Sequence, residues 1–446
     1  MQFTVFIFQI RGSPGQSLLV MPRAAKHSSA SHFYSATIDP LRTTHAMPST
    51  LPTPDSLNAL SKRADELRQL LIKWCNQNSG SDNPAGLAAM LELLHAEFSK
   101  LPGAKLERIA LNGTANKALR VKVRPTAPLQ LLISGHYDTV YGAGHPFQRA
   151  EWIAPDTLRG PGTADMKGGL VVMLAALQAF EKTPHVAQIG YEILLGPDEE
   201  TGSQDSTSLL EETAGRHRFG LVFEPARANG DLVKSRKGTG IFTLTCRGRA
   251  AHAGRAAAAG RNAILALCEI LPQVAALGLD RTMPGLMVNI GAIKGGGAAN
   301  IVPDFAEAVI NARVTNIGDD ILFLKRLHDI CAPIHAREGF RLEIGGGFNR
   351  APKIESPFEV ALFGMWQRCG AELGLHLDWQ HVGGGSDGNI LASAGLPNLD
   401  GLGCVGDHLH SPEEFCYLPS LVQRAQVAAL FLHRVAAGEI VLPVRP

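Results

Sequence analysis

Apolar residues recur at helical spacing in several parts of the chain. From Leu57 to Cys75 they occupy one face of a helix, and the same spacing predicts helices over 85–99 and 167–180. Short apolar runs predict strands over 105–111, 119–124, 129–135, 188–195 and 219–224. Strands that alternate with helices indicate an α/β fold, with a mostly parallel sheet and helices on both of its faces.

The pattern changes near residue 238. From there it predicts strand 239–247, helix 259–276, strands 284–293 and 305–314, helix 318–337 and strand 340–346. That β-α-β-β-α-β order is the ferredoxin-like split unit. Helices over 356–373 and 419–437 then restore the first pattern. We therefore expect one α/β domain made of 56–237 and 350–446, an inserted α+β domain at 238–349, and a disordered leader or mis-called start at 1–55.

Three of the predicted strands lead directly into acidic or histidine side chains. The residues that follow them are His136 and Asp138, Glu199 and Glu200, and Glu224. Because the carboxyl ends of strands in an open α/β sheet share one crevice, we expect these side chains to meet. Acids that converge repel one another unless a cation lies between them, which favours a metal site.

His136 and Asp138 are two residues apart in a strand, so their side chains point to the same face. Asp138 is therefore placed to hold the second nitrogen of a metal-bound imidazole. Taken alone, the pair is also typical of a buried histidine with a structural aspartate. Asp165 has glycines around it that permit close backbone approach. It can be shared between two ions, or it can cap the helix that follows.

Glu199 and Glu200 are adjacent and cannot be equivalent, so one can bind metal while its neighbour acts as a base. The alternative for this acidic string is a solvated turn, which the apolar strand before it disfavours. Near the C-terminus, His408 and His410 are both candidates for a ligand. Each residue is weak support for a metal site by itself, and their shared position at strand and loop ends of one sheet is strong support.

Charge favours two ions over one. Two divalent cations carry four positive charges, which three carboxylates and a bridging hydroxide balance, and neutral histidines complete the shells. The expected carboxylates are those of Asp165, Glu200 and Glu224, and the histidines are His136 and His410. Two ions roughly 3.5–4 Å apart would polarise a carbonyl and lower the pKa of a shared water toward ~7.

Composition excludes several classes of protein. The 446 residues are 45% hydrophobic and 19% charged, as in a globular protein, and the net charge of +1 comes without the basic run expected of a nucleic-acid binder. No apolar stretch approaches the ~20 residues that span a bilayer. The seven cysteines are scattered, which indicates free thiols in a reducing compartment and a cytoplasmic location. The phosphate-binding Gly-x-x-x-x-Gly-Lys-Ser/Thr pattern is absent.

Five motifs, in order, resemble those of the dinuclear zinc metallopeptidases. The motifs are His136-x-Asp138, Gly162-Thr163-Ala164-Asp165-Met166-Lys167-Gly168, Asp198-Glu199-Glu200-Thr201-Gly202, Glu224-Pro225 and His410-Ser411. That family includes glutamate carboxypeptidase, aminoacylase, acetylornithine deacetylase and succinyl-diaminopimelate desuccinylase. The resemblance extends over about residues 57–440, including the inserted domain.

The resemblance implies a role for each residue of the expected centre. Asp165 would bridge two zinc ions, His136 and Glu224 would bind one, and Glu200 and His410 the other. Glu199 would act as general base, and a cis peptide would follow Asp165. The family pattern favours His410 over His408, because His410 directly precedes Ser411. Zinc is the expected metal, although cobalt and manganese accept the same ligands.

The resemblance also implies roles for residues outside the metal ligands. His252, in the inserted domain, would reach a catalytic site and stabilise the oxyanion, while Arg313, Asn300 and Gly384 would bind a substrate carboxylate. Arg313 is also compatible with a surface strand position and Asn300 with a turn. Relatives commonly dimerise through this domain, so a homodimer is expected.

The expected activity is amide hydrolysis that releases an amino acid. Glu224 stands where desuccinylases and aminoacylases usually carry Asp, so the chain looks more like the glutamate carboxypeptidase branch, an exopeptidase. The alternatives are an N-acyl amino acid deacylase or desuccinylase and, from another class, a non-catalytic dimeric binding protein on the same scaffold. The expected partner is a small N-acyl amino acid or peptide with a free carboxylate, and neither nucleic acid nor membrane.

Overall fold

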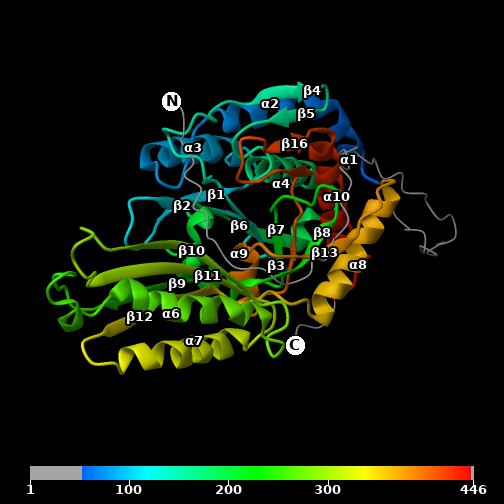
Figure 1. Ribbon diagram of the computed structural model, residues 1–446. Helices are drawn as coiled ribbons and strands as arrows, with labels where there is room; N and C mark the ends of the chain where they lie inside the picture. The colour runs from blue at the N-terminus through cyan, green and yellow to red at the C-terminus, as the bar shows by residue number, and fades with distance from the viewer. Residues whose placement is uncertain (1–52, 443–446) are drawn as a thin grey trace, which may run out of the picture. The chain divides into compact units, whose positions relative to one another are not determined.

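The computed structural model describes residues 53–442, so nearly all of the predicted leader at 1–55 lies outside the described residues. None of the helices between residues 53 and 442 has the length and apolar character needed to cross a membrane. Two larger sheets and a small one organise this part of the chain (Figure 1).

The largest sheet has eight strands, and its centre is parallel. The strands are β1 (Lys105–Ala110), β2 (Lys117–Val123), β3 (Leu129–His136), β6 (Ile189–Gly196), β7 (Gly220–Val222), β8 (Leu232–Arg236), β13 (Trp379–Val382) and β14 (Asn398–Asp400). Their order is β1-β2-β6-β3-β7-β14-β8-β13. β6, β3, β7 and β14 run parallel, whereas β1 and β2 are antiparallel to their neighbours. The sheet is thus mixed and mostly parallel, as predicted.

Helices cover both faces of this sheet. They are α1 (Asp55–Asn58), α2 (Ala64–Cys75), α3 (Pro84–Phe98), α4 (Lys167–Phe180), α5 (Thr207–Ala214), α8 (Pro357–Glu372), α9 (Asp387–Ser393) and α10 (Pro419–Ala436). Leu131 and Ile133 of β3 share a core with α2, α4, α8 and α10, whereas Leu132 between them packs with α5 and α9. Successive side chains of a strand point to opposite faces, so β3 is buried on both.

The large unit differs from the sequence expectation in several places, since the sequence did not predict β8, β13, β14, α5 or α9. The helix predicted over 57–75 is interrupted by a 3-10 turn at Ala59–Arg63, a tighter helix that is common in short pieces. A small antiparallel sheet, in the order β15-β16-β5-β4, was not predicted. Its strands are β4 (Glu151–Ala154), β5 (Thr157–Arg159), β15 (Gly406–Asp407) and β16 (Phe415–Tyr417). It joins the segment around residue 410 to the segment around residue 160.

Residues 238–350 form the four-stranded sheet with the predicted element order. The elements are β9 (Gly238–Arg247), α6 (Ala263–Ala276), β10 (Met287–Gly295), β11 (Phe305–Val314), α7 (Asp319–His335) and β12 (Arg341–Arg350). The strands are antiparallel in the order β10-β11-β9-β12, and α6 and α7 lie on one face (Figure 1). Phe242 packs under these helices, whereas its neighbour Ile241 points to the other face and is 53% exposed. One face of this sheet is therefore open.

The chain enters and leaves this four-stranded unit at one place. The backbone N–H groups of Arg236 and Lys353 each donate to the other residue's carbonyl, at 3.0 Å. Both side chains also meet the buried Asp400 of β14, Arg236 through two hydrogen bonds of 2.7 and 2.8 Å and Lys353 at 3.9 Å. The two connections are thus tied to each other and to the large sheet.

Candidate metal centre

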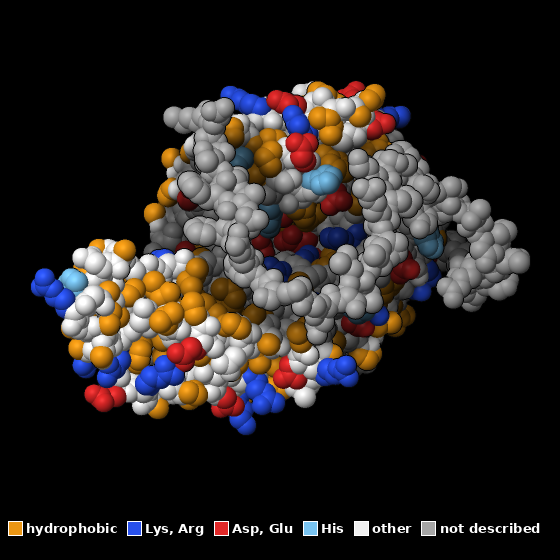
Figure 2. Space-filling model, viewed as in Figure 1, with side chains coloured by type: hydrophobic (Ala, Val, Ile, Leu, Met, Phe, Trp, Pro, Cys, Tyr) orange, Lys and Arg blue, Asp and Glu red, His pale blue; other side chains and the backbone are white. Residues whose placement is uncertain are grey.

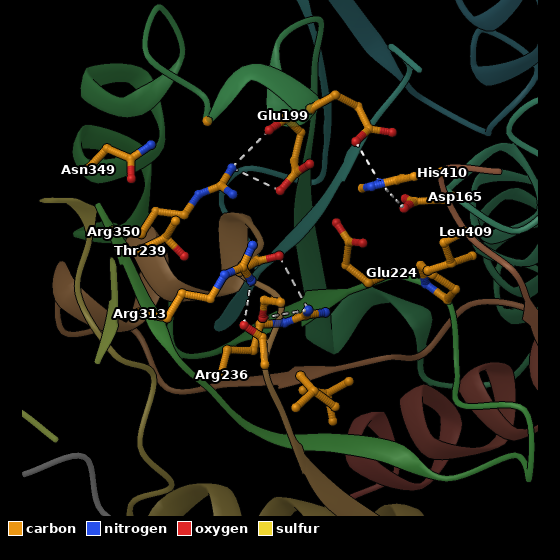
Figure 3. A pocket seen from close by; sticks show the side chains of 18 of the residues that line it. Asp165, Glu199, Glu224, Arg236, Thr239, Arg313, Asn349, Arg350, Leu409 and His410 are labelled. Atoms are coloured by element: carbon orange, nitrogen blue, oxygen red, sulfur yellow. Dashed lines mark hydrogen bonds and ion pairs between the residues drawn. The ribbon is translucent and has the colours of Figure 1, made fainter. Parts of the chain in front are cut away.

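The expected ligands converge at the carboxyl end of the large sheet. His136, the last residue of β3, places Nε2 3.1 Å from Oδ1 of Asp165 and 3.7 Å from Oε1 of Glu224. His410 places Nε2 3.3 Å from Oδ2 of Asp165 and 3.0 Å from Oε2 of Glu200 (Figure 3). Asp165 therefore presents one oxygen to each histidine, with one further glutamate on each side. Ligand atoms of His136, Asp165 and Glu200 all lie within 4.8 Å of one another, so these three side chains could hold a metal ion.

Backbone structure explains why these side chains meet. β6 ends at Gly196, and the next residues form a 3-10 turn, Glu199–Thr201, which carries both glutamates. Glu224 follows β7, which is parallel to β3 and hydrogen-bonded to it. Asp165 precedes α4 and does not cap it, because no side chain caps that helix. The peptide bond between Asp165 and Met166 is cis, as the resemblance implied.

Asp138 connects the first histidine to the acidic turn. Its Oδ1 lies 3.1 Å from Nδ1 of His136, where it holds the imidazole by the nitrogen that faces away from Asp165. The same carboxylate accepts the backbone N–H groups of Glu199 and Glu200, both at 3.1 Å, and the Ser81 hydroxyl at 2.8 Å. A carboxylate in this position fixes the orientation of a ligating histidine.

The electrostatics of the cluster favour bound cations. Burial raises the pKa of Glu200 to about 8 and that of Glu224 well above its usual range, and the neighbouring Asp165 adds to both shifts. Hydrogen bonds with Asp165 and Glu200 raise the pKa of His410 to about 11. Oε1 of Glu224 is buried and accepts no hydrogen bond from the described part of the chain. Carboxylate oxygens and imidazole nitrogens are the ligands that divalent zinc accepts, so this donor set fits such ions.

Glu199 is held differently from the other acids. Its Oε1 forms a 2.8 Å ion pair with Arg350, whose guanidinium also donates to the Glu199 carbonyl at 3.1 Å and to Ser203 at 2.8 Å. Oε2 remains 3.9 Å from Nε2 of His136, on the side of the ligands. Sequence reasoning missed Arg350, because it ends β12, 151 residues after Glu199, and no local pattern marks it.

A cavity of about 510 Å³ opens beside the cluster. Asp165, Glu199, Glu200, Glu224 and His410 line it on one side, and Arg236, Thr239, Ile241, Asn311, Arg313, Arg350, Gly383, Gly384 and Gly385 are among its other residues. Figure 2 shows acidic, basic and histidine side chains together in a recess of the surface. Charged groups of both signs therefore meet in one space that is large enough for a small substrate.

The residues expected to bind substrate divide into two groups. Arg313 and Gly384 line the cavity, and Arg313 donates to the Gly383 carbonyl at 2.6 Å (Figure 3). His252 and Asn300 are exposed and do not line it, and they belong to neighbouring loops that pair with each other. The Ala253 N–H donates to the Asn300 carbonyl at 2.9 Å. His252 and Asn300 thus lie outside the cavity of their own chain.

Comparisons with known proteins agree with this geometry. The chain is 27% identical over 376 residues to carboxypeptidase G2 of Pseudomonas sp. (strain RS-16), an alignment that covers 83% of this chain and 89% of that protein. It is 29% identical over 354 residues to succinyl-diaminopimelate desuccinylase of Shewanella piezotolerans, covering 74% and 88%. The fold matches aminopeptidase PepT of Bacillus cereus with a TM-score of 0.70 at 20% identity, covering 84% of this chain and 99% of that one.

The family assignment rests on a match to a family model over more than half of the chain. Residues 132–434 match the peptidase family M20/M25/M40, and this range contains every acid and histidine of the cluster. The relatives of this chain include both a carboxypeptidase and a desuccinylase. The chain therefore belongs to peptidase family M20/M25/M40 and is a metal-dependent hydrolase.

Proposed function

We propose that the cluster holds two divalent cations, with Zn²⁺ as the favoured metal and Co²⁺ or Mn²⁺ as alternatives. In this proposal Asp165 bridges the ions, His136 and Glu224 complete one site, and Glu200 and His410 complete the other. The observation that supports two ions is the position of Asp165, whose Oδ1 faces His136 and whose Oδ2 faces His410.

The proposed reaction is hydrolysis of an amide bond that releases an amino acid with a free carboxylate. Arg313 carries this proposal. It lines the same cavity as Glu199 but forms no ion pair with an acid among residues 53–442, and its polar contacts are the Gly383 carbonyl and the Asn311 amide. A guanidinium can bind a carboxylate through two parallel hydrogen bonds. Gly384 lines the cavity beside it and would accommodate the same group.

Glu199 is the proposed general base. Bound divalent cations would supply a polarised substrate carbonyl and a water of lowered pKa. Glu199 would take the proton of that water on Oε2, since Arg350 holds Oε1, and would return it to the leaving nitrogen. Asp138 would keep His136 and the backbone of the acidic turn in place during this cycle.

His252 and Asn300 fit this scheme only if they act on another copy of the chain. Both are exposed and lie outside their own cavity. Met287 and Ile293 of the edge strand β10 are both 54% exposed, which suits a contact between copies. We therefore propose a homodimer formed through an inserted domain at 238–349, with 56–237 and 350–446 as the catalytic domain. Seven free cysteines fit the proposed cytoplasmic location.

Two substrate classes compete within this activity. A glutamate carboxypeptidase-like exopeptidase would cleave a C-terminal residue from a peptide or acyl-glutamate. An N-acyl amino acid deacylase or desuccinylase would remove a simple acyl group. Both reactions release an amino acid whose carboxylate Arg313 would bind. We favour the exopeptidase, because position 224 is Glu and desuccinylases and aminoacylases usually carry Asp there. The non-catalytic binding protein considered earlier is disfavoured, because every ligand position and the base are present.

The test combines metal analysis with a substrate panel. Metal content per chain is measured on purified protein, and hydrolysis is then followed for acyl-glutamates, N-acyl and N-succinyl amino acids, and matched substrates whose carboxylate is amidated. We expect two ions per chain, hydrolysis of at least one carboxylate substrate and little turnover of its amide. Arg313→Ala should remove most of that preference. Equal turnover of acid and amide would contradict the assignment of Arg313.

A further inference from the structure

Glu414 is a buried carboxylate that is not among the expected ligands. It is 1% exposed, and each of its oxygens accepts two hydrogen bonds. Oε1 accepts the backbone N–H groups of Ala164 and Asp165, both at 3.0 Å. Oε2 accepts the Gly162 N–H at 3.2 Å and the Tyr141 hydroxyl at 3.0 Å. Both oxygens are thus engaged by groups of the protein.

These contacts tie together three segments that are far apart in sequence. The Glu414 carbonyl accepts the Gly160 N–H at 3.1 Å, so the main chain and side chain of one residue both hold the loop before Asp165. The hydroxyl of Tyr141, which follows β3, also lies 2.8 Å from the Ser411 carbonyl, so its single hydrogen is shared between that carbonyl and Glu414. The three segments are the end of β3, the loop 160–165 and the loop 408–416. They carry His136, Asp165 and His410 respectively.

The loop 160–165 depends on this carboxylate. Among residues 53–442, Glu414 is the acceptor that the structure gives to the N–H groups of Ala164 and Asp165. Gly162 has φ +72°, a left-handed backbone that glycine adopts without steric cost. A small displacement of this loop would move both oxygens of Asp165 relative to the two histidines.

We infer that Glu414 is a positioning residue that sets the bridging carboxylate of Asp165 for both metal sites, without binding metal itself. This inference rests on the proposed function, since it requires that Asp165 binds metal. Partners outside the ligand shell of a metal site typically change affinity about 10–100-fold when they are removed. The competing explanation is that Glu414 only stabilises the fold, as buried hydrogen-bonded carboxylates do elsewhere.

Glu359 offers a matched control for that explanation. It is also a buried carboxylate, 3% exposed, on the first turn of α8. It accepts the backbone N–H groups of Ser356 at 2.8 Å and Asn398 at 3.1 Å. It touches none of the expected ligands, so its loss should affect the fold and not the metal sites.

The experiment compares Glu414→Ala, Glu414→Gln, Glu359→Ala and Glu359→Gln in the full chain. Cobalt is titrated into each metal-free protein, and the affinity of each site and the visible absorption spectrum are recorded with far-UV circular dichroism and melting temperature. We expect Glu414→Ala to weaken cobalt binding about 10–100-fold at both sites and to change the spectrum. Both Glu359 variants should melt earlier yet bind cobalt as the wild type does.

Glu414→Gln should be intermediate. The glutamine carbonyl oxygen can still accept from Ala164 and Asp165, but its NH₂ group would face the Gly162 N–H, which would lose its acceptor. If the Glu414 variants do not fold, Tyr141→Phe takes their place, since it removes only the hydroxyl between Ser411 and Glu414. It should weaken cobalt binding several-fold, mainly at the site that contains His410.

The outcomes separate this inference from the proposed function. Folded Glu414 variants with wild-type cobalt affinity and spectrum would overturn the positioning role and leave the proposed function intact, and for Tyr141→Phe the same result would have the same meaning. A wild-type protein that binds no cobalt would instead overturn the proposed metal centre, and this inference with it.

Discussion

The metal centre and the open face of the four-stranded sheet are built in opposite ways. At the centre, His136 is fixed by Asp138, the acidic turn by the same Asp138, and the Asp165 loop by Glu414. In the inserted unit, Arg313 on the open face is held by one carbonyl and one amide, and His252 lies on an exposed loop. His136, the Asp165 loop and Glu199 are thus each fixed by a charged residue outside the expected ligands, whereas Arg313 and His252 are not so fixed by any residue that the structure describes.

That difference has a physical reason. Metal ligands and a general base must be held within a fraction of an ångström of their working positions, which requires several partners for each side chain. Side chains that recognise a substrate gain a hydrogen-bond or ion-pair partner when the substrate binds. They can therefore have few partners in the free protein. Metal removal or substitution at the centre should therefore abolish hydrolysis. Substitution in the inserted unit should reduce hydrolysis or change the substrate preference.

Metal removal should have the largest effect. None of the expected ligands belongs to the three apolar cores, so a chelator should abolish hydrolysis while the far-UV circular dichroism spectrum remains unchanged. Added Zn²⁺ should restore activity, and the melting temperature should rise with metal concentration because the ions bind only the folded chain. Hydrolysis that persists after complete metal removal would show that the chemistry lies elsewhere.

Glu199→Gln should have the second-largest effect on activity. It removes the proposed base and keeps a side chain of the same shape, so kcat should fall by roughly 10²–10⁴ while the metal content stays that of the wild type. Glu200→Gln is the matched comparison one residue away. It removes a proposed ligand, so it should lower metal content as well as kcat. Normal turnover in the Glu199 variant would remove this residue from the mechanism.

His252→Ala tests the exposed loop of the inserted unit and should have a smaller effect. Loss of one oxyanion donor typically lowers kcat by about 10²–10³. Because His252 lies outside its own cavity, mixing this variant with Glu199→Gln should restore part of the activity, through mixed dimers that contain one intact site. Wild-type kcat in the variant, or no recovery on mixing, would contradict a role across a dimer interface.

Asp387→Asn should leave activity close to normal and change the pH dependence of stability. Burial and the nearby Glu199 raise the pKa of Asp387 to about 7, so the folded chain keeps a proton that the unfolded chain releases above about pH 4. The wild type should therefore lose stability relative to the variant as pH rises from about 4 to 7, by roughly 1 kcal/mol per pH unit. Urea unfolding at several pH values measures this, and parallel curves would contradict it.

Long periodic elements could be read from the sequence. The helix predicted over 167–180 is observed as Lys167–Phe180, and the helix and strand order of 238–350 was predicted correctly. The acids and histidines at strand ends could also be predicted, because a parallel sheet brings its carboxyl ends together. The positions of His136, Glu200 and Glu224 therefore follow from periodicity and one rule of sheet topology. Asp165 and His410 lie on loops, and their roles were expected from the family resemblance.

What could not be predicted depends on contacts between distant segments. β15 has two residues and β5 has three, which is too short for any periodicity to appear. Glu414 and Arg350 are single charged residues on a loop and at a strand end, and their partners lie 249 and 151 residues away. Neither the spacing nor the type of the surrounding residues distinguishes them from surface charges.

The paired hydrogen bonds between Arg236 and Lys353 have a consequence for how this architecture could arise and be re-engineered. Because the residues that flank 237–352 meet in one antiparallel β-bridge, a tight turn could close the same gap without moving β8 or β14. Units of other sizes could be exchanged at this seam, each anchored by the ion pairs to Asp400. Because Arg350, which holds Glu199, lies within the exchanged residues, a replacement unit would have to supply an equivalent arginine for the hydrolytic centre to keep its surroundings.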